Sequence, residues 1–283
     1  MRILSDGSPT LPVAAGPVGS VTEASTLGVA PVPGVPPLDI RPGWFHMARP
    51  GVAEQLIRPV LDDTGPVREP GLDIDRGFYL PVPPWELAVY RVVAEGRTQV
   101  GLVLEIALDD HLPGRIRPHE DRGATTLGVL DDRLAGSGLD VAPVTLAHRP
   151  DREVSLALAE VTGHPAALVE TSRDGAVHEV WLVEADRFAP VLDRLARTDS
   201  LDILDTHHRC AAAARRTGPG RDRPAPRGAG GEQARHRLFA FVVAHGLPDV
   251  QGFEPLARGV DPTSVAPRGP AGLFMRERVA WSA

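Results

Sequence analysis

The chain has 283 residues with 30 arginines, no lysine and 37 acidic residues, so its net charge is −7 at pH 7 and broad attraction to nucleic acid or anionic lipid is not expected. The absence of lysine also excludes the phosphate-binding lysine of a P-loop and any Schiff-base chemistry. A single cysteine, Cys210, excludes an intrachain disulfide, and no apolar run approaches the roughly 20 residues that span a bilayer, so we expect a soluble, cytoplasmic protein.

The first 37 residues differ in composition from the remainder of the chain. They are rich in proline, glycine, serine and alanine without apolar periodicity, and we interpret them as a disordered tail. Residues 38–283 are expected to form a single α/β domain. Within it, residues 69–84 are again rich in glycine and proline, which indicates a loop or a run of turns.

Apolar, β-branched runs predict strands through the middle of the chain. Two hairpins are predicted over residues 87–107 and 167–183, with turns that contain Gly96 and Gly175. Between them, residues 142–147 form a further apolar run. Strands therefore dominate this part of the expected fold.

Helical patterning begins after the second hairpin. Apolar residues at three- and four-residue spacing predict a helix over residues 184–197, followed by a short strand at residues 201–204. An alanine-rich stretch that ends in arginines predicts a helix at residues 210–216, because a helix C-terminus favours cations. A mobile loop at residues 218–231 and a strand at residues 238–244 follow. Since hairpins and strand–helix units occur together, we expect an α/β (α+β) fold with a mixed β-sheet and flanking helices.

The junction between the short strand and the alanine-rich helix carries Asp205, Thr206, His207, His208 and Arg209. A helix start exposes unpaired N–H groups that attract anions, and hydroxyl, imidazole and guanidinium groups all donate to phosphate oxygens. The carboxylate of Asp205 is suited to a divalent metal that bridges phosphates. The alternative is that Asp205 or Thr206 only caps the helix and that the histidines are solvated.

A second cluster of charged residues, at positions 115–122, follows the first hairpin. Glu120 beside His119 offers a general base that could deprotonate a hydroxyl group. Arg117 and Arg122 offer further contacts to an anion. The alternative is a charged, solvated turn without a chemical role.

The histidines raise one more alternative, a metal site. His119, His207 and His208 together would suit metal-assisted hydrolysis, although the chain has no His-Glu-x-x-His or Cys-x-x-Cys spacing to support it. The other histidines are isolated, and we interpret them as surface or core residues: His46, His111, His148, His164, His178, His236 and His245.

Three short motifs follow one another along the chain. They are Val89-Tyr90-Arg91, Pro118-His119-Glu120 and Asp205-Thr206-His207-His208-Arg209. Their order and separation resemble the prokaryotic family known as domain of unknown function 1015, whose last motif is Asp-Gly-His-His-Arg. The resemblance extends over roughly residues 40–260.

That family is similar to the superfamily of partition protein B and sulfiredoxin, in which a turn at a helix start cradles nucleotide phosphates. Some members of this superfamily are free-serine kinases. The resemblance implies that Thr206 to Arg209 bind nucleotide phosphate and that Glu120, with His119, acts as the base. One position departs from the pattern: Thr206 replaces a glycine, and a β-branched residue does not readily adopt positive φ or admit a phosphate close to the main chain.

Together these observations favour a nucleotide-dependent phosphotransferase that acts on a small hydroxylated metabolite such as an amino acid. The expected cofactors are Mg²⁺ and ATP or ADP. Two alternatives remain: a non-catalytic nucleotide-binding module, including a degenerate paralogue, and a metal-dependent hydrolase. The acidic net charge and the absence of a helix-turn-helix pattern after the last motif argue against a nucleic-acid partner, and no membrane partner is expected.

Overall fold

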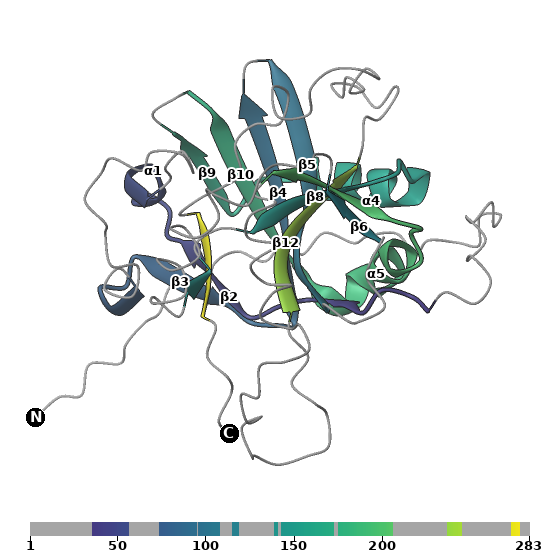
Figure 1. Ribbon diagram of the computed structural model, residues 1–283. Coiled ribbons are helices and arrows are strands. Elements are labelled where there is room, and N and C mark those ends of the chain that lie inside the picture. Colours follow the sequence, from purple (N-terminus) through teal and green to yellow (C-terminus); the bar gives the residue numbers. More distant parts are fainter. Residues whose placement is uncertain are drawn as a thin grey trace, which may run out of the picture.

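The computed structural model has three layers (Figure 1). A large mixed sheet lies in the middle, two helices cover one of its faces, and a small sheet packs against part of the other. The structure describes residues 36–56, 74–94, 96–107, 115–118, 139–140, 143–172, 175–205, 237–244 and 273–277.

The large sheet contains nine strands among the described residues. They follow the order β6-β11-β8-β12-β5-β4-β10-β9, and β1 pairs with the end of β5. Strand β11 runs parallel to β6, and β12 runs parallel to β8, whereas the other neighbours are antiparallel. The sheet is therefore mixed, as the sequence predicted. Its strands are Ile40–Arg41 (β1), Glu86–Ala94 (β4), Arg97–Ala107 (β5), Ile116–Pro118 (β6), Val144–His148 (β8), Leu168–Thr171 (β9), Val177–Glu184 (β10), Leu201–Asp205 (β11) and Arg237–Ala244 (β12).

Both predicted hairpins are confirmed. Strands β4 and β5 form the first and β9 and β10 the second, and their turns hold Gly96 at φ 73° and Gly175 at φ 84°. Glycine adopts such positive φ values without the steric cost that other residues meet. The strands predicted at residues 142–147, 201–204 and 238–244 correspond to β8, β11 and β12.

The small sheet contains four antiparallel strands among the described residues, in the order β3-β2-β13-β7. None of them was predicted, and the interpretation of residues 69–84 as turns is wrong at β3. Tyr79 and Val82 bury their side chains there, and Pro81 is tolerated because β3 is the outermost strand of the order. The strands are Phe45–Ala48 (β2), Tyr79–Val82 (β3), Leu139–Asp140 (β7) and Phe274–Glu277 (β13).

The helix layer is formed by α4, Arg152–Thr162, and α5, Ala189–Ala196. Together with the 3-10 turn η1, Ala185–Phe188, α5 confirms the helix predicted over residues 184–197, except that Glu184 still belongs to β10. Helix α4 was not predicted. It begins after Asp151, whose carboxylate accepts hydrogen bonds from the main-chain N–H groups of the second and third residues that follow, at 2.9 and 3.1 Å.

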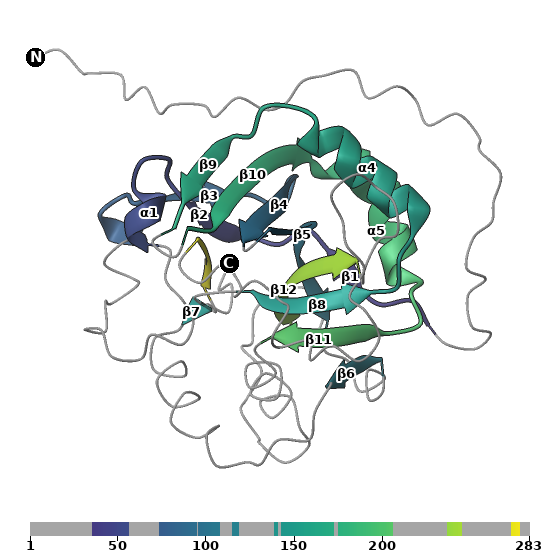
Figure 2. The ribbon, with the colours of Figure 1, turned by 90° about the horizontal axis from the view of Figure 1, so that it is seen from above.

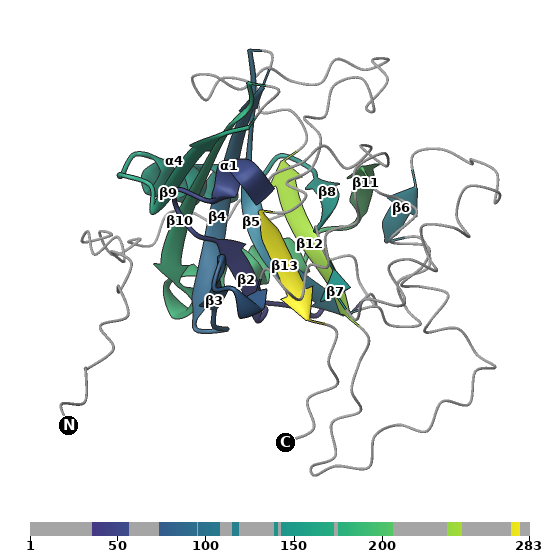
Figure 3. The same ribbon diagram turned by 90° about the vertical axis from the view of Figure 1, so that its left-hand side faces the viewer.

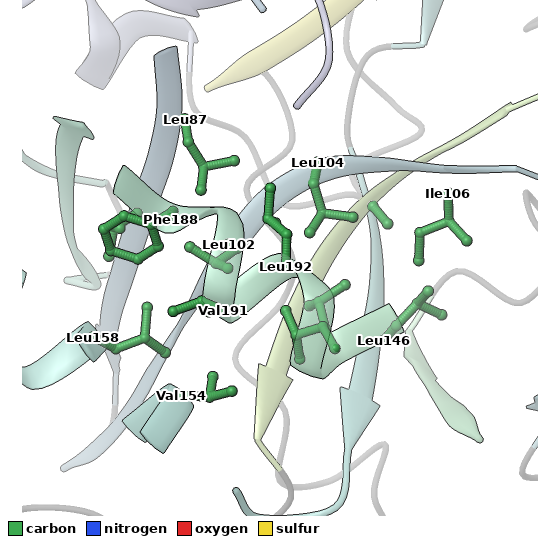
Figure 4. Close-up of a cluster of buried hydrophobic side chains, with 14 of the residues drawn as sticks. Leu87, Leu102, Leu104, Ile106, Leu146, Val154, Leu158, Phe188, Val191 and Leu192 are labelled. Atoms are coloured by element: carbon green, nitrogen blue, oxygen red, sulfur yellow. The ribbon is translucent and has the colours of Figure 1, made fainter. Parts of the chain in front are cut away.

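Side chains alternate along the strands and build a separate apolar core on each face of the large sheet. On β12, Leu238 and Val242 belong to the helix-side core, whereas Phe239 and Phe241 belong to the core beneath the small sheet. Because both faces are covered, the strands are nearly continuous apolar runs. Figure 4 shows the helix-side core, in which side chains of the helix layer pack against strand residues: Val154, Leu158, Phe188, Val191 and Leu192 against Leu87, Leu102, Leu104, Ile106 and Leu146.

The remaining predictions concern parts of the chain that are described only at their margins. The predicted tail is described at residues 36 and 37 alone, and the predicted helix at 210–216 and loop at 218–231 lie outside the described residues.

A short helix, α1 at Ala53–Leu56, follows β2. No helix within the described ranges combines the length and apolarity that crossing a bilayer requires.

Candidate functional site

Strands β6 and β11 lie side by side and run in the same direction, so their carboxyl ends meet at one edge of the large sheet (Figure 2). Leu201 of β11 pairs with Ile116 of β6, and Ile203 pairs with Pro118. Strand β6 ends directly before His119-Glu120, and β11 ends at Asp205, directly before Thr206. The two motifs therefore leave the sheet from neighbouring strands at the same edge, which we call the motif edge.

The start of β6 is tied to the segment that leads into β11. Arg115 donates to the carbonyl oxygens of Thr198, Pro36 and Asp199 at 2.5, 2.6 and 3.4 Å. Its own carbonyl accepts from the main-chain N–H of Leu201 at 2.6 Å. Burial lowers the pKa of the Arg115 guanidinium, and the nearby Asp199 carboxylate opposes this shift. Arg115, part of the charged cluster at 115–122, therefore holds the parallel strand pair together.

Strand β11 is irregular where it approaches the motif edge. Its pairing with β8 shifts register between Ile203 and Asp205, which places Asp205 opposite Thr145 and leaves Leu204 as the extra residue of a bulge. Bulges bend a strand and redirect its side chains, and they recur next to active sites. The strand thus changes course at the position where the last motif begins.

Thr145 is the polar residue of β8 nearest to this bulge. The residue is only 2% exposed to solvent, and its hydroxyl oxygen is buried without a hydrogen-bond partner in the described structure. Buried hydroxyl groups are nearly always hydrogen-bonded, so an exception needs an explanation. Thr145 was not among the predicted site residues, although a threonine within an apolar run is a visible departure from the pattern.

Two of the predicted site residues lie on these strands. Asp205 ends β11 and Arg117 is the central residue of β6, where it pairs with Asp202; the main chain is described at both positions. No group of three or more metal-ligating side chains occurs among the described residues. The other predicted site residues lie outside the described ranges: His119, Glu120, Arg122, Thr206, His207, His208 and Arg209.

A second polar cluster lies in the other half of the large sheet, beneath the small sheet. The hydroxyl groups of Tyr90 and Ser172 lie 2.7 and 3.0 Å from Nδ1 and Nε2 of His178, and none of the three residues is more than 8% exposed. Because the Ser172 hydroxyl donates to the Ala176 carbonyl at 3.1 Å, we assign the imidazole proton to Nε2 and the accepting role to Nδ1. Each of the three side chains in this polar cluster therefore has a hydrogen-bond partner.

The next residue of the Val89-Tyr90-Arg91 motif is also paired. Arg91 lies opposite Glu179 across strands β4 and β10 and binds its carboxylate with two nitrogens, of which Nη2 lies 2.7 Å from Oε1. The guanidinium carbon lies 5.1 Å from the ring centroid of Trp181. His178 is buried, which agrees with the interpretation of the isolated histidines as surface or core residues, and Val89 and Tyr90 of the motif are buried as well.

The region that carries all these features matches one family model. That model, described as "Protein of unknown function (DUF1015)", matches residues 76–251, more than half of the chain. The chain belongs to the DUF1015 family. Neither a curated protein nor a solved structure matches it.

The DUF1015 match contains the three motifs and every described strand of the large sheet except β1. Strands β2 and β13 of the small sheet lie outside it. The motif edge is therefore part of the region by which this DUF1015 protein is assigned to its family.

Proposed function

We propose that this DUF1015 protein transfers a phosphoryl group from ATP or ADP to the hydroxyl group of a small metabolite such as an amino acid. The observation that carries the proposal is the parallel pairing of β6 with β11, which starts both motifs from one edge. In open α/β sheets, ligands commonly bind just beyond the carboxyl ends of the strands. A phosphate-binding motif and a base motif that leave the sheet together can serve one substrate pair.

Phosphate binding is assigned to Thr206, His207, His208 and Arg209. Their hydroxyl, imidazole and guanidinium groups can donate hydrogen bonds, and the guanidinium group of arginine can bind two phosphate oxygens at once. Arg117 and Arg122, which flank the base motif, add positive charge next to the same edge. The resemblance to the superfamily of partition protein B and sulfiredoxin supports this assignment.

The base in this proposal is Glu120, oriented by His119. The hydroxyl oxygen of the acceptor attacks the terminal phosphorus, and its proton passes to the Glu120 carboxylate. The bond from that phosphorus to the bridging oxygen breaks, and the electron pair leaves with the nucleotide, which becomes one phosphate shorter. The arginines stabilise the negative charge that spreads over the transferred phosphoryl oxygens.

A magnesium ion beside the phosphates is part of this proposal. Mg²⁺ takes oxygen ligands and usually keeps several waters, so one or two protein oxygens beside the phosphates are enough. Asp205 supplies a carboxylate where β11 ends, opposite Thr145, whose buried hydroxyl oxygen has no partner in the described structure. When bound, the ion would neutralise part of the phosphate charge.

One feature favours a second candidate, a non-catalytic nucleotide-binding module. Thr206 occupies the position that is glycine in the family motif, and its β-branched side chain hinders a close approach of phosphate to the main chain. For this candidate we expect calorimetry to detect binding of ATP or CTP while no product forms.

The proposal is tested by incubating the purified protein with ATP or ADP, Mg²⁺ and a panel of amino acids. We expect a phosphorylated product from the wild type, and a rate lower by about a hundredfold or more in Glu120→Gln, because the base is lost. Glu160→Gln is the matched control, since it makes the same change at an exposed position of α4, in the helix layer. A folded wild type that forms no product contradicts the proposal, and stoichiometric zinc or iron in the purified protein would instead favour a hydrolase.

A further inference from the structure

The Thr145 hydroxyl is unusual among the buried hydroxyl groups of the described structure. Ser155 donates to the Asp151 carbonyl at 2.7 Å, and Ser172 donates to the Ala176 carbonyl at 3.1 Å. Thr145 is as deeply buried, yet its Oγ1 has no partner in the described structure. A valine of the same shape would fill the position without the desolvation penalty, so packing alone does not explain a threonine there.

The strand pairing places Thr145 opposite Asp205, the residue directly before the phosphate motif. Thr145 lies opposite Asp205 on one side and opposite Phe241 on the other. Val144 and Leu146 belong to the helix-side core, so alternation turns Thr145 toward the other face of the large sheet. On that face the described strands of the small sheet lie in front of β4, β5 and β12 (Figure 3), and Ala147 of β8 and Leu204 of β11 belong to the same apolar core. Thr145 therefore belongs to the part of the sheet from which both motifs depart.

We propose that the Thr145 hydroxyl donates a hydrogen bond to a phosphate oxygen of the nucleotide. This assignment deepens the proposed function and rests on it. It identifies the phosphate rather than the acceptor because β8 adjoins β11, from which the phosphate motif starts, while the base motif starts from β6 on the far side of β11. A ligand oxygen supplies the partner that the described structure does not provide.

The test compares Thr145→Val, which removes the hydroxyl at nearly constant shape, with Thr145→Ser, which keeps it. Calorimetry with Mg²⁺–ADP and with pyrophosphate is expected to show affinities weaker by about tenfold or more for Thr145→Val with both probes. Thr145→Ser is expected to stay within about threefold of the wild type, because the donor is retained. Equal losses with the two probes would locate the contact on the phosphates.

Thermal unfolding without ligand gives an independent readout. Thr145→Val is expected to melt at or above the wild-type temperature, because no protein hydrogen bond is lost. Ser155→Ala is the mirror control: it removes a satisfied hydroxyl on the helix side, so it should lower the melting temperature and leave both affinities unchanged.

Three results would overturn the assignment, and each is distinct. If the wild type binds neither probe, the proposed function fails and the assignment falls with it. If the wild type binds both and Thr145→Val binds equally well, the role of Thr145 alone is wrong. If Thr145→Val melts several degrees lower without ligand, as expected for Ser155→Ala, the hydroxyl has a protein partner and is not held for a ligand.

Discussion

The two halves of the large sheet differ in whether their buried polar groups have hydrogen-bond partners. In the half formed by β4, β10 and β9, Tyr90, His178 and Ser172 bind one another, and Arg91 is paired with Glu179. In the half formed by β8, β11 and β6, Thr145 has a buried hydroxyl without a partner in the described structure. The first half is antiparallel throughout, whereas the second combines a parallel pair with a bulge.

Under our proposal, this contrast separates polar groups that stabilise the fold from a hydroxyl group that binds a ligand. A buried polar group that is satisfied within the protein contributes to stability, whereas an unsatisfied one reduces it and persists where function requires it. The half in which these named polar side chains are paired thus acts as a scaffold. The half with the motif edge is the place to look for chemistry.

The largest effect is expected at Gly101, on β5 where the two halves join. A Cβ atom there would lie 2.1 Å from the carbonyl oxygen of Val242 and 2.9 Å from the Phe241 ring. Gly101→Ala must push β5 away from β12, so we expect the free energy of unfolding to fall by about 3 kcal/mol or more in urea titration.

Gly175→Ala is the control for this substitution. Its φ is 84° and no atom lies within 4 Å of the added Cβ, so only backbone strain of about 1 kcal/mol is expected. If Gly101→Ala and Gly175→Ala lowered the free energy of unfolding equally, the close approach of β5 to β12 at Gly101 would not be what joins the two halves.

A smaller effect is expected where the helices brace the motif half. Asp151 caps α4, which follows β8, and also binds Arg194 of α5, which precedes β11, at 2.8 Å. Asp151→Ala removes both the cap and the ion pair, so we expect a loss of about 2 kcal/mol at neutral pH. Asp151→Asn keeps the cap and should lose less, about 1 kcal/mol.

The same pair gives a pH dependence with a defined sign. Burial by itself would raise the pKa of Asp151, but hydrogen bonds from Arg194 and from the N–H groups of Val154 and Glu153 outweigh it, and the pKa is lowered. The carboxylate therefore stabilises the fold above the unfolded-state pKa, and this contribution is lost as the pH falls through the folded-state value. The difference between wild type and Asp151→Asn should shrink below about pH 4; a constant difference would contradict the ion pair.

A substitution with a smaller effect than Asp151→Ala distinguishes the paired hydroxyl of Tyr90 from the unpaired hydroxyl of Thr145. Tyr90→Phe keeps the ring packing but removes the hydrogen bond to Nδ1 of His178, so we expect a loss of about 1.5 kcal/mol in chemical unfolding and no change in nucleotide affinity. Thr145→Val should instead keep its stability and bind the nucleotide more weakly. If both variants lose similar stability, the contrast between the halves does not hold.

The sequence predicted the large sheet well for a physical reason. Strands covered on both faces are continuous apolar runs, and Gly96 and Gly175 mark the two hairpin turns. The small sheet escaped prediction because its strands are short and pair across long stretches of chain, as Phe274 does with Met47. Helix α4 did carry a signal, the Asp151 cap before Val154, Leu158 and Val161, but the exposed Leu156 blurs its apolar stripe.

The sequence predicted that both motifs serve one site, but not which strands carry them there. That the two motifs start from neighbouring strands depends on the pairing of Ile116 with Leu201, which involves a strand of three residues that ends in proline. Such pairing follows from tertiary packing and from the Arg115 contacts, not from local propensity. Likewise, Thr145 becomes a candidate for ligand binding only when the strand register shows that it lies opposite Asp205.

The central claim, that the Pro118-His119-Glu120 motif and the Asp205–Arg209 motif act at one edge, is tested most directly by a distance. Cys210 follows Arg209 and is the chain's single cysteine, so Glu120→Cys supplies the second spin-label site. Val169→Cys is the control, because Val169 is 58% exposed on β9, six strand spacings from β11.

For the pair at residues 120 and 210 we expect a separation within about 15 Å by electron paramagnetic resonance, the span of one nucleotide-plus-acceptor pocket. For the control pair at residues 169 and 210 we expect roughly 25–30 Å. A folded protein in which residues 120 and 210 lie as far apart as the control pair would contradict a shared site.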